Sequence, residues 1–349
     1  MSGVRVLITA RRGLDYNRVR VLLAGLRAVA PEDFDVYAFG ERNRATGAEL
    51  ERRARACDVV YVPPFRARDV AFAKRWGAGR PVVFDPLIGT TITRVVDFGW
   101  WWRRPLARLR DRRDFGRADH LIFDTEAHRA WSVATLGLDA ERTHVLHIGS
   151  DTAAFPAVGV RPWRPGDPLT VGFYGSYVPL QGGEVIIEAA SRLAHRREIG
   201  FELIGDVDAS RAVRRARYRF PDARVEYVPH LGFDELAGRL RGYDVCLGVF
   251  GASLKADVVA PNKLYHYAAL GKPIVTRESR GAREVFGDGE VLFVEPTAEA
   301  LATAIEALAD DPSFARSLGE AAARRTREHL TERHVAERFL AICRLAAGR

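Results

Sequence analysis

Short apolar runs alternate with amphipathic stretches along most of the chain, and this alternation restricts the possible folds most strongly. In the first part of the chain, apolar runs occur at 4–10, 34–39, 58–62, 81–85, 120–124 and 144–148. Strands of a parallel sheet are buried on both faces, so they read as continuous apolar runs separated by helices. The pattern therefore predicts an α/β domain with a parallel sheet covered on both sides.

A stretch rich in proline and glycine then interrupts the pattern at 152–168. Such a composition ends regular structure and is typical of a linker. The alternation restarts with apolar runs at 169–175, 201–205, 224–228, 244–250, 273–276 and 291–295. We predict two Rossmann-like, doubly wound parallel-sheet domains that face each other across a cleft. The predicted parts are a first domain at 1–155, a linker at 156–168, a second domain at 169–325, and a closing segment at 326–349 whose helix packs back on the first domain.

The chain carries a formal charge of +8 and 47% hydrophobic residues. A positive charge favours an anionic ligand, an acidic membrane surface or nucleic acid, but the basic residues match no nucleic-acid reader motif, so we predict no nucleic-acid partner. The three cysteines are isolated, which predicts neither a metal site nor a disulfide framework. No run reaches the ~18 apolar residues of a membrane span. We expect a cytoplasmic protein, soluble or peripheral at the inner membrane face; its oligomeric state stays open.

The segment 99–117, GWWWRRPLARLRDRRDFGR, combines Trp100, Trp101 and Trp102 with seven arginines. Tryptophan beside arginine suits the headgroup layer of a membrane or an aromatic platform for an acceptor, because both offer an apolar face edged by charge. Ordinary packing of these rings inside the first domain is the favoured interpretation, and contact with a membrane surface is the alternative. Peripheral membrane contact is thus one prediction for this segment.

Residues 261–276, PNKLYHYAALGKPIVT, join a helix start near Asn262 to a buried strand through a Gly-Lys-Pro corner. The amides of a first helical turn have no acceptor within the helix, and Lys263 adds a positive charge there, so this helix start is a candidate phosphate cradle. Only four residues of the chain are lysines, and three of them lie within 255–272. An ordinary helix, turn and strand unit without a ligand is the other interpretation.

A strand, a glycine-bearing loop and a helix follow one another at 171–190, VGFYGSYVPLQGGEVIIEAA. Open α/β sheets bind ligands at such a position, outside the carboxyl ends of their strands. Gly175, Gly182 and Gly183 would let backbone amides approach a pyrophosphate. The loop lacks the Gly-x-Gly-x-x-Gly fingerprint, and the chain has no P-loop, which disfavours a nicotinamide dehydrogenase.

Several segments occur in the order and spacing of one known family. They are GSYVPLQGG, FELIGD, HLGFDEL, YDVCLGVFG, PNKLYHYAALGKPIVT and LFVEPTAEALATAIEAL in the second domain, and FDPLIG, ADHLIFDTEAH and HIGSDTAAF in the first. The chain thereby resembles GT-B fold glycosyltransferases of the retaining family 4 type. The resemblance implies a UDP- or GDP-linked sugar donor held mainly by the second domain, an acceptor held mainly by the first, and no metal or other cofactor.

The sequence departs from the family pattern at four positions. Aligned on the Gly-Lys-Pro corner, Val258 and His266 stand where the family has two glutamates, and Ser176 and Gln181 stand where it has an arginine and a lysine on the glycine loop. His266 could still bond a ribose hydroxyl. Lys255, Lys263 and Arg277 are candidates to replace the missing cations. Within this likeness, the predicted donor-binding residues are Gly175, Ser176, Gln181, Gly182, Gly205, Leu231, Asn262, Lys263, Leu264 and His266.

The predicted catalytic residues are Asp85, Lys255 and Lys263, and Arg12, Gly13 and Thr90 are predicted on the acceptor side. Asp85 would orient a sugar hydroxyl or an acceptor group, although an Asp-Pro strand end is also a common turn. The leading prediction is a metal-independent glycosyltransferase acting on a small-molecule, glycan or lipid-linked acceptor. The alternatives are a non-catalytic subunit that binds a nucleotide sugar and a sugar-nucleotide epimerase or phosphorylase.

Overall fold

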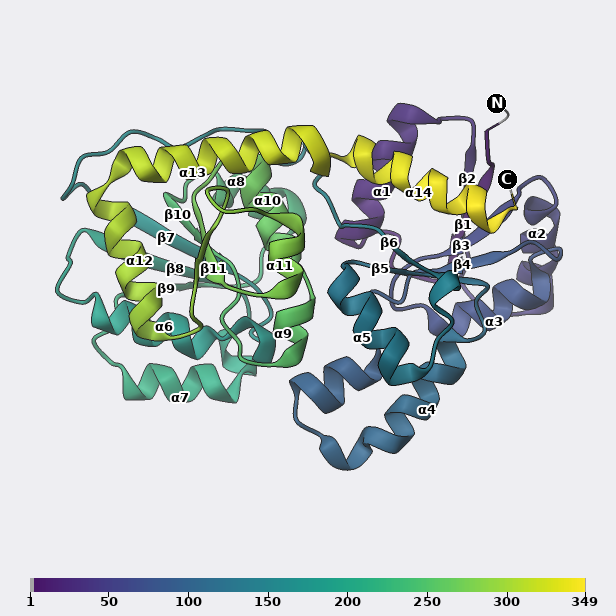
Figure 1. The fold of residues 1–349 in the computed structure, drawn as a ribbon, viewed down its shortest axis with the longest axis horizontal. Helices are drawn as coiled ribbons and strands as arrows, with labels where there is room; N and C mark the ends of the chain where they lie inside the picture. Colours follow the sequence, from purple (N-terminus) through teal and green to yellow (C-terminus); the bar gives the residue numbers. More distant parts are fainter. Residues whose placement is uncertain (1–2, 349) are drawn as a thin grey trace. The chain divides into compact units, whose positions relative to one another are not determined.

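A computed structural model describes residues 3–348 of the chain. The chain folds into two compact units (Figure 1). One unit is Met1–Asp151 with Leu330–Arg349, and the other is Thr152–His329. Residues 1–2 and 349 of the predicted domains lie outside the described residues. The predicted fold, two parallel sheets with flanking helices, is confirmed.

The first unit is built on a parallel sheet in the order β2-β1-β3-β4-β5-β6. Its strands are β1 (Val6–Ala10), β2 (Phe34–Ala38), β3 (Val59–Val62), β4 (Val82–Phe84), β5 (His120–Phe123) and β6 (Thr143–Val145). Its helices are α1 (Asn17–Val29), α2 (Arg44–Ala54), α3 (Ala67–Trp76), the π-helix η1 (Thr91–Asp97), the 3-10 helix η2 (Trp101–Arg103), α4 (Arg104–Phe115), α5 (Glu126–Leu136), the 3-10 helix η3 (Ala140–Arg142) and α14 (Glu332–Ala346).

The second unit is built on a parallel sheet in the order β12-β11-β10-β7-β8-β9. Its strands are β7 (Leu169–Tyr174), β8 (Ile199–Ile204), β9 (Val225–Val228), β10 (Val245–Leu247), β11 (Ile274–Arg277) and β12 (Leu292–Val294). Its helices are η4 (Pro179–Gln181), α6 (Gly183–Arg192), η5 (Val207–Ala209), α7 (Arg211–Arg219), α8 (Phe233–Leu240), α9 (Leu254–Val258), α10 (Asn262–Leu270), α11 (Arg280–Val285), α12 (Ala298–Asp310), α13 (Pro312–Arg325) and the π-helix η6 (Thr326–Leu330).

The first unit has two apolar cores, one on each face of its sheet, and successive side chains of a strand pack alternately into one or the other. Val6 and Ile8 of β1 pack with α1 and α14, whereas Leu7 packs on the opposite face with residues of α2 and α3. Successive strand residues point to opposite faces, so an uninterrupted apolar run fills both cores at once. This is why the continuous apolar runs predicted a sheet covered on both sides.

The last helix of the chain packs on the first one. A methyl group at Gly25 of α1 would overlap the carbonyl of Glu332 at the start of α14, so the two backbones approach as closely as glycine permits. The ring of Phe339 on α14 meets Tyr61 of β3 edge to face, with 4.9 Å between ring centroids. Residues that follow the second unit in sequence therefore complete the core of the first.

The predicted linker at 156–168 has no regular secondary structure and packs on the second unit. The amide of Val158 donates to the carbonyl of Leu270 over 3.0 Å. The indole of Trp163 is buried in the core of that unit and donates to the carbonyl of Ala309 over 3.2 Å. This proline-rich stretch is thus part of the second unit's packing.

Candidate functional site

The topology of the second unit marks one position for a ligand. Strand β7 pairs with both β8 and β10, so the sheet has the 3-2-1-4-5-6 order of a dinucleotide-binding fold, and connections leave the β7/β10 border in opposite directions. In open α/β sheets the crevice at such a border, beyond the carboxyl ends of the strands, holds the ligand. The loop at 175–182, which we call the switch-point loop, leaves β7 at this border.

Backbone hydrogen bonds tie the switch-point loop to the segment after β10. The amide of Phe250 donates to the carbonyl of Gln181 over 3.1 Å, and that of Gly251 donates to the carbonyl of Leu180 over 3.0 Å. The side chain of Gln181 accepts from the amide of Tyr177 over 3.3 Å. The loop is therefore held at three points before any ligand arrives.

Two glycines allow backbone segments to approach each other closely beside the switch-point loop. Gly205, after β8, has φ +132°, and a methyl group there would overlap the carbonyl oxygen of Gly175. Gly182 has φ +63° and caps α6, and a methyl group there would overlap the backbone of Phe250. Both positions need a conformation that side chains disfavour and a contact that excludes them. Of the predicted residues, Gly205 is thus brought against Gly175, and Gly182 lies against the segment after β10.

Helix α6 starts at Gly183, directly after the switch-point loop. Amides in the first turn of a helix have no acceptor within it, and the helix dipole adds positive potential, so a helix start favours an anion. Ser176 of the same loop is exposed, and Gln181 is half-buried. The loop and the start of α6 together can hold a phosphate with backbone amides, without the two cations expected on this loop from the resemblance.

Arg277 brings a cation to the neighbouring strand end. It is the last residue of β11, its amide donates to the carbonyl of Val249 over 3.0 Å, and its guanidinium donates to the carbonyl of Gly251. Gly251 in turn is bonded to the switch-point loop. The half-buried Arg277 is therefore connected to the loop through a single residue.

His266 lies inside the second unit, under this edge of the sheet. Its side chain is 3% exposed, its Nδ1 is 2.8 Å from the hydroxyl of Tyr174, and its ring stacks on Phe155 with 4.0 Å between centroids. Burial lowers the pKa of His266 to about 3, so the ring is neutral near pH 7. A neutral ring suits a hydrogen bond to a hydroxyl better than an ion pair.

This depressed pKa gives a test by acid unfolding. A histidine that binds its proton more weakly when folded stabilises the protein fully above pH 6.5, and that stability is lost as the pH falls toward 3. The loss amounts to about 1.4 kcal/mol for each pH unit below 6.5. As the pH is lowered between these values, we expect the midpoint of unfolding in urea to decrease less steeply for His266→Phe than for the native chain. The exposed His230, changed to Phe, is the matched control and should leave the slope unchanged.

Lys263 is also buried, with 3% of its side chain exposed. Its amine lies over the ring of Phe173, 3.6 Å from the centroid, and has no hydrogen-bond partner among residues 3–348. Burial lowers the pKa of this amine well below its usual value. The sequence predicted a charge presented to a phosphate, whereas the structure places the amine in the core, because the side chain of the second helical residue points back to β7.

The other predicted donor residues surround the same edge at different depths. Asn262 and Leu231 are half-buried, whereas Leu264 and Val258 are buried completely. Lys255 on α9 is 5% exposed. Val258 offers no polar side-chain atom at the place where the resemblance leads one to expect a glutamate.

In the first unit, Asp85 belongs to a buried network behind β4. It is fully buried, forms an ion pair with Arg18 of α1, and accepts from the hydroxyl of Tyr61 over 3.3 Å and the amide of Leu87 over 3.0 Å. Arg18 also donates to the carbonyl of Leu146 over 2.9 Å. Burial raises the pKa of the Asp85 carboxyl, and the Arg18 cation opposes that shift. The geometry joins α1, β3 and the loop after β4.

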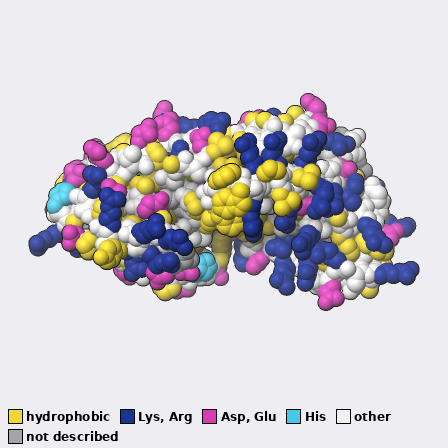
Figure 2. All heavy atoms as spheres, turned by 90° about the horizontal axis from the view of Figure 1, so that it is seen from below, with side chains coloured by type: hydrophobic (Ala, Val, Ile, Leu, Met, Phe, Trp, Pro, Cys, Tyr) yellow, Lys and Arg dark blue, Asp and Glu magenta, His cyan; other side chains and the backbone are white. Residues whose placement is uncertain are grey.

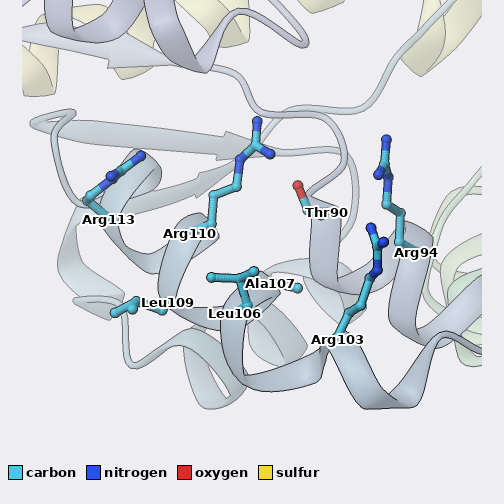
Figure 3. Close-up of a pocket in the computed structure, with 8 residues that line it drawn as sticks. All are labelled: Thr90, Arg94, Arg103, Leu106, Ala107, Leu109, Arg110 and Arg113. Atoms are coloured by element: carbon cyan, nitrogen blue, oxygen red, sulfur yellow. The ribbon is translucent and has the colours of Figure 1, made fainter.

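The predicted acceptor-side residues follow strands of the first sheet. Arg12 is exposed, and Gly13 has φ +85° after β1, at the border where β1 pairs with both β2 and β3. Thr90 precedes η1, and its amide donates to Asp111 of α4 over 3.0 Å. Sequence reasoning missed a cavity of about 460 Å³ beside Thr90, lined by Arg94, Arg103, Leu106, Ala107, Leu109, Arg110 and Arg113 (Figure 3). The spacing of 106, 109, 110 and 113 on one helix face was the signal for it.

Comparison with known proteins places the fold. HepE of Anabaena, solved in complex with UDP-glucose, superposes with a TM-score of 0.73 at 13% identity over 99% of this chain and 100% of that chain. Sucrose-phosphate synthase from Thermosynechococcus elongatus superposes with a TM-score of 0.71 at 16% identity over 99% and 100%. The chain has the GT-B fold.

Sequence comparison finds similarity that runs from the start of α6, directly after the switch-point loop, into α14. A family model described as glycosyl transferase-like matches residues 183–341. D-inositol 3-phosphate glycosyltransferase from Pseudarthrobacter chlorophenolicus is 30% identical over 220 residues, which cover 59% of this chain and 51% of that protein. The GT-B chain thus spans about half the length of the curated relatives that it matches.

Proposed function

We propose that this protein is a glycosyltransferase that moves a sugar from a nucleoside diphosphate to an acceptor. The observation that carries the proposal is the switch-point loop, whose glycines let backbone segments and the start of α6 converge at the carboxyl edge of the second sheet. The similarity of residues 183–341, which begin at the start of α6 directly after this loop, to glycosyl transferase-like proteins supports it. The donor is a UDP- or GDP-linked sugar, and UDP comes first because the structurally similar HepE was solved with UDP-glucose.

The chemistry follows from where negative charge develops. As the bond between the sugar and the diphosphate breaks, charge accumulates on the leaving phosphate, and preformed donors directed at it lower the barrier. The amides at the start of α6 and the guanidinium of Arg277 supply such donors. The departing phosphate takes the proton of the acceptor on the same face of the sugar, so the anomeric configuration is retained. The first unit holds the acceptor through the loops that contain Arg12, Gly13 and Thr90.

Turnover decides between transfer and its rivals. The purified protein is incubated with UDP- and GDP-linked hexoses and a panel of hydroxyl acceptors, with EDTA present, and free diphosphate and sugar products are followed. We expect diphosphate release that depends on an acceptor and is insensitive to EDTA, with an anomeric signal in NMR that matches the donor. An isomerised sugar without diphosphate release would assign an epimerase instead.

A non-catalytic nucleotide-sugar subunit is the second candidate. The observation that favours it is that the two positions of the family glutamates hold a buried valine and a buried, neutral histidine, Val258 and His266. This candidate predicts donor binding in calorimetry at a stoichiometry of one without turnover for any acceptor. Turnover in the panel above would dismiss it.

Arg277 and Lys263 can be separated as phosphate ligands. A hydrogen bond to a charged group contributes roughly 1.5–3 kcal/mol, so Arg277→Gln should weaken donor binding by about tenfold or more. Lys263→Met fills the same volume without burying an unpaired amine, so it should keep or raise the unfolding midpoint. If Lys263 also meets the donor, Lys263→Met will lose affinity as Arg277→Gln does. Calorimetric titration with UDP and GDP measures both, and unchanged affinity for Arg277→Gln would remove it from the site.

A further inference from the structure

Large apolar side chains gather on one surface of the first unit. Among residues 3–348, five of the eleven exposed large hydrophobic residues lie between positions 98 and 109. Single exposed apolar residues are normal, whereas a contiguous group marks an interaction site. We call this surface the Trp–Arg patch; it comprises Phe98, Trp101, Trp102, Leu106 and Leu109 with Arg94, Arg103, Arg110 and Arg113.

Helix α4 presents this patch because its two faces differ. The face toward the core carries Ala107, Asp111, Asp114 and Phe115, all buried. The opposite stripe carries Leu106 and Leu109, which are 71% and 66% exposed. Trp101 and Trp102, just before the helix, are 75% and 60% exposed. In Figure 1, α4 lies on the lower side of the first unit, and Figure 2, seen from below, shows hydrophobic and basic side chains together on that side of the unit.

The charge of the patch is strongly positive because its acids are engaged inside the protein. Residues 99–117 contain seven arginines and two aspartates. Asp111 accepts from the amides of Thr90 and Thr91 over 3.0 and 2.6 Å, so it anchors α4 to the loop after β4. Asp114 is 7% exposed and forms ion pairs with Arg110, Arg113 and Arg117. One carboxylate is thus shared by three guanidiniums, and with two aspartates against seven arginines the segment 99–117 keeps a net positive charge.

Apolar and cationic groups alternate at short range within the patch. In Figure 3, Leu106 and Ala107 lie between Arg110 on one side and Arg103 and Arg94 on the other, and the arginine side chains extend to the same side. These residues enclose the cavity of about 460 Å³. The guanidiniums of Arg94 and Arg103 lie 5.5 and 5.2 Å from the ring centroid of Trp100, which fixes the aromatic segment beside the helix.

We propose that the Trp–Arg patch binds the surface of a membrane that contains anionic phospholipid. The indoles of Trp101 and Trp102 and the side chains of Leu106 and Leu109 enter the boundary between headgroups and acyl chains, and the arginines pair with lipid phosphates. Indoles and long basic side chains favour this layer, since each has an apolar body and a polar end. No helix within residues 3–348 is long and apolar enough to cross a membrane, so the contact is peripheral.

Vesicle binding tests the proposal without any donor sugar, so the outcome is independent of the proposed function. The full chain is mixed with vesicles of phosphatidylcholine alone or with phosphatidylglycerol, and bound protein is separated by flotation. We expect binding to the anionic vesicles only, and much weaker binding when NaCl rises from about 0.1 M to about 1 M, which shortens the screening length from ~10 to ~3 Å. Equal binding to both kinds of vesicle would overturn the proposal.

Variants locate the contact. Each basic side chain near an anionic surface contributes about a fivefold factor, so Arg103→Gln, Arg110→Gln and Arg113→Gln together should weaken binding about 100-fold. Helix α7 is the matched control, because it carries exposed arginines and Tyr218, 91% exposed, on the other unit. Arg211→Gln, Arg215→Gln and Arg219→Gln together should weaken binding less than about threefold. An equal loss of vesicle binding in both triple variants would mean that net charge alone determines binding, and it would overturn the proposal.

Entry of the tryptophans into the bilayer can be measured separately, by quenching of their fluorescence. Lipids brominated along the acyl chain quench only tryptophans that enter the bilayer. We expect quenching in the native chain and its loss in the Trp101→Ser, Trp102→Ser double variant, together with a loss of vesicle binding of about tenfold or more, the factor for withdrawing a large apolar side chain. Full quenching in the double variant, or quenching equally produced by an added RNA oligonucleotide, would overturn the assignment of this patch to lipid.

Discussion

Gly205→Ala should destabilise the second unit by about 3 kcal/mol and remove the nucleotide binding that we propose for it. The φ of +132° at Gly205 is a conformation that residues with a side chain rarely adopt, and the added methyl group would overlap the carbonyl of Gly175 and approach the ring of Tyr177 to 3.1 Å. The overlapping atoms belong to the backbone, so they cannot turn away as a flexible side chain would. Urea unfolding followed by circular dichroism measures the loss, and calorimetry measures nucleotide binding.

A second glycine of the same unit is the control for this substitution. Gly238 lies in the exposed face of α8, and a methyl group there meets nothing within 4 Å. Because alanine favours a helix over glycine by about 1 kcal/mol, Gly238→Ala should hold or raise the unfolding midpoint. Similar midpoints for the two variants would mean that the close approach of the strand ends does not constrain the switch-point loop.

Arg18→Met should destabilise the first unit by about 3–5 kcal/mol, because it leaves the Asp85 carboxylate buried without its cation. Both side chains are almost completely inaccessible to solvent, and Tyr61 and Leu87 supply only neutral hydrogen bonds to Asp85. The surface pair of the exposed Arg52 and the half-buried Glu49 is the control, since a surface pair contributes about 0–1 kcal/mol. Unfolding in urea separates the two expectations.

The same pair can decide whether Asp85 acts in the chemistry. Replacing both partners, Arg18→Met with Asp85→Leu, removes the unpaired charge and should restore most of the lost stability. Turnover by this double variant then separates two roles. Activity that returns with stability would make Asp85 a structural anchor of the loop after β4. A stable but inactive double variant would support the predicted catalytic role.

The strands were predictable from sequence because each is a buried apolar run. The strand predicted at 244–250 illustrates the limit, since it ends at Leu247 in the structure. Val249 and Phe250 are 2% and 1% exposed, as strand residues would be, but the backbone there turns to bond the switch-point loop. Burial sets the apolar pattern, whereas the loop partner that ends the strand lies elsewhere in the chain.

Helix α4 and its cavity were not predictable in the same way. The core-facing side of α4 contains Asp111 and Asp114, which break the apolar periodicity that marks an amphipathic helix. Their burial depends on amides of the loop after β4 and on neighbouring arginines, which sequence periodicity does not reveal. Lys263 is a similar case, because the ring that receives its amine, Phe173, comes from a strand far away in the sequence. The glycines of the candidate site could be named from the sequence, although the contacts that require them join distant segments, Gly205 with Gly175 and Gly182 with Phe250.

The packing of α14 on α1 has a consequence for how the chain matures. The polypeptide enters the second unit at Thr152 and leaves it only at His329, so one unit is inserted within the other. On a ribosome, the second unit emerges completely while the first unit still lacks α14. The side chains of Val335 and Phe339 on that helix belong to the same core as Leu22 and Leu26 of α1. The half that is translated first is thus completed last, and we expect its apolar surface to stay uncovered until then.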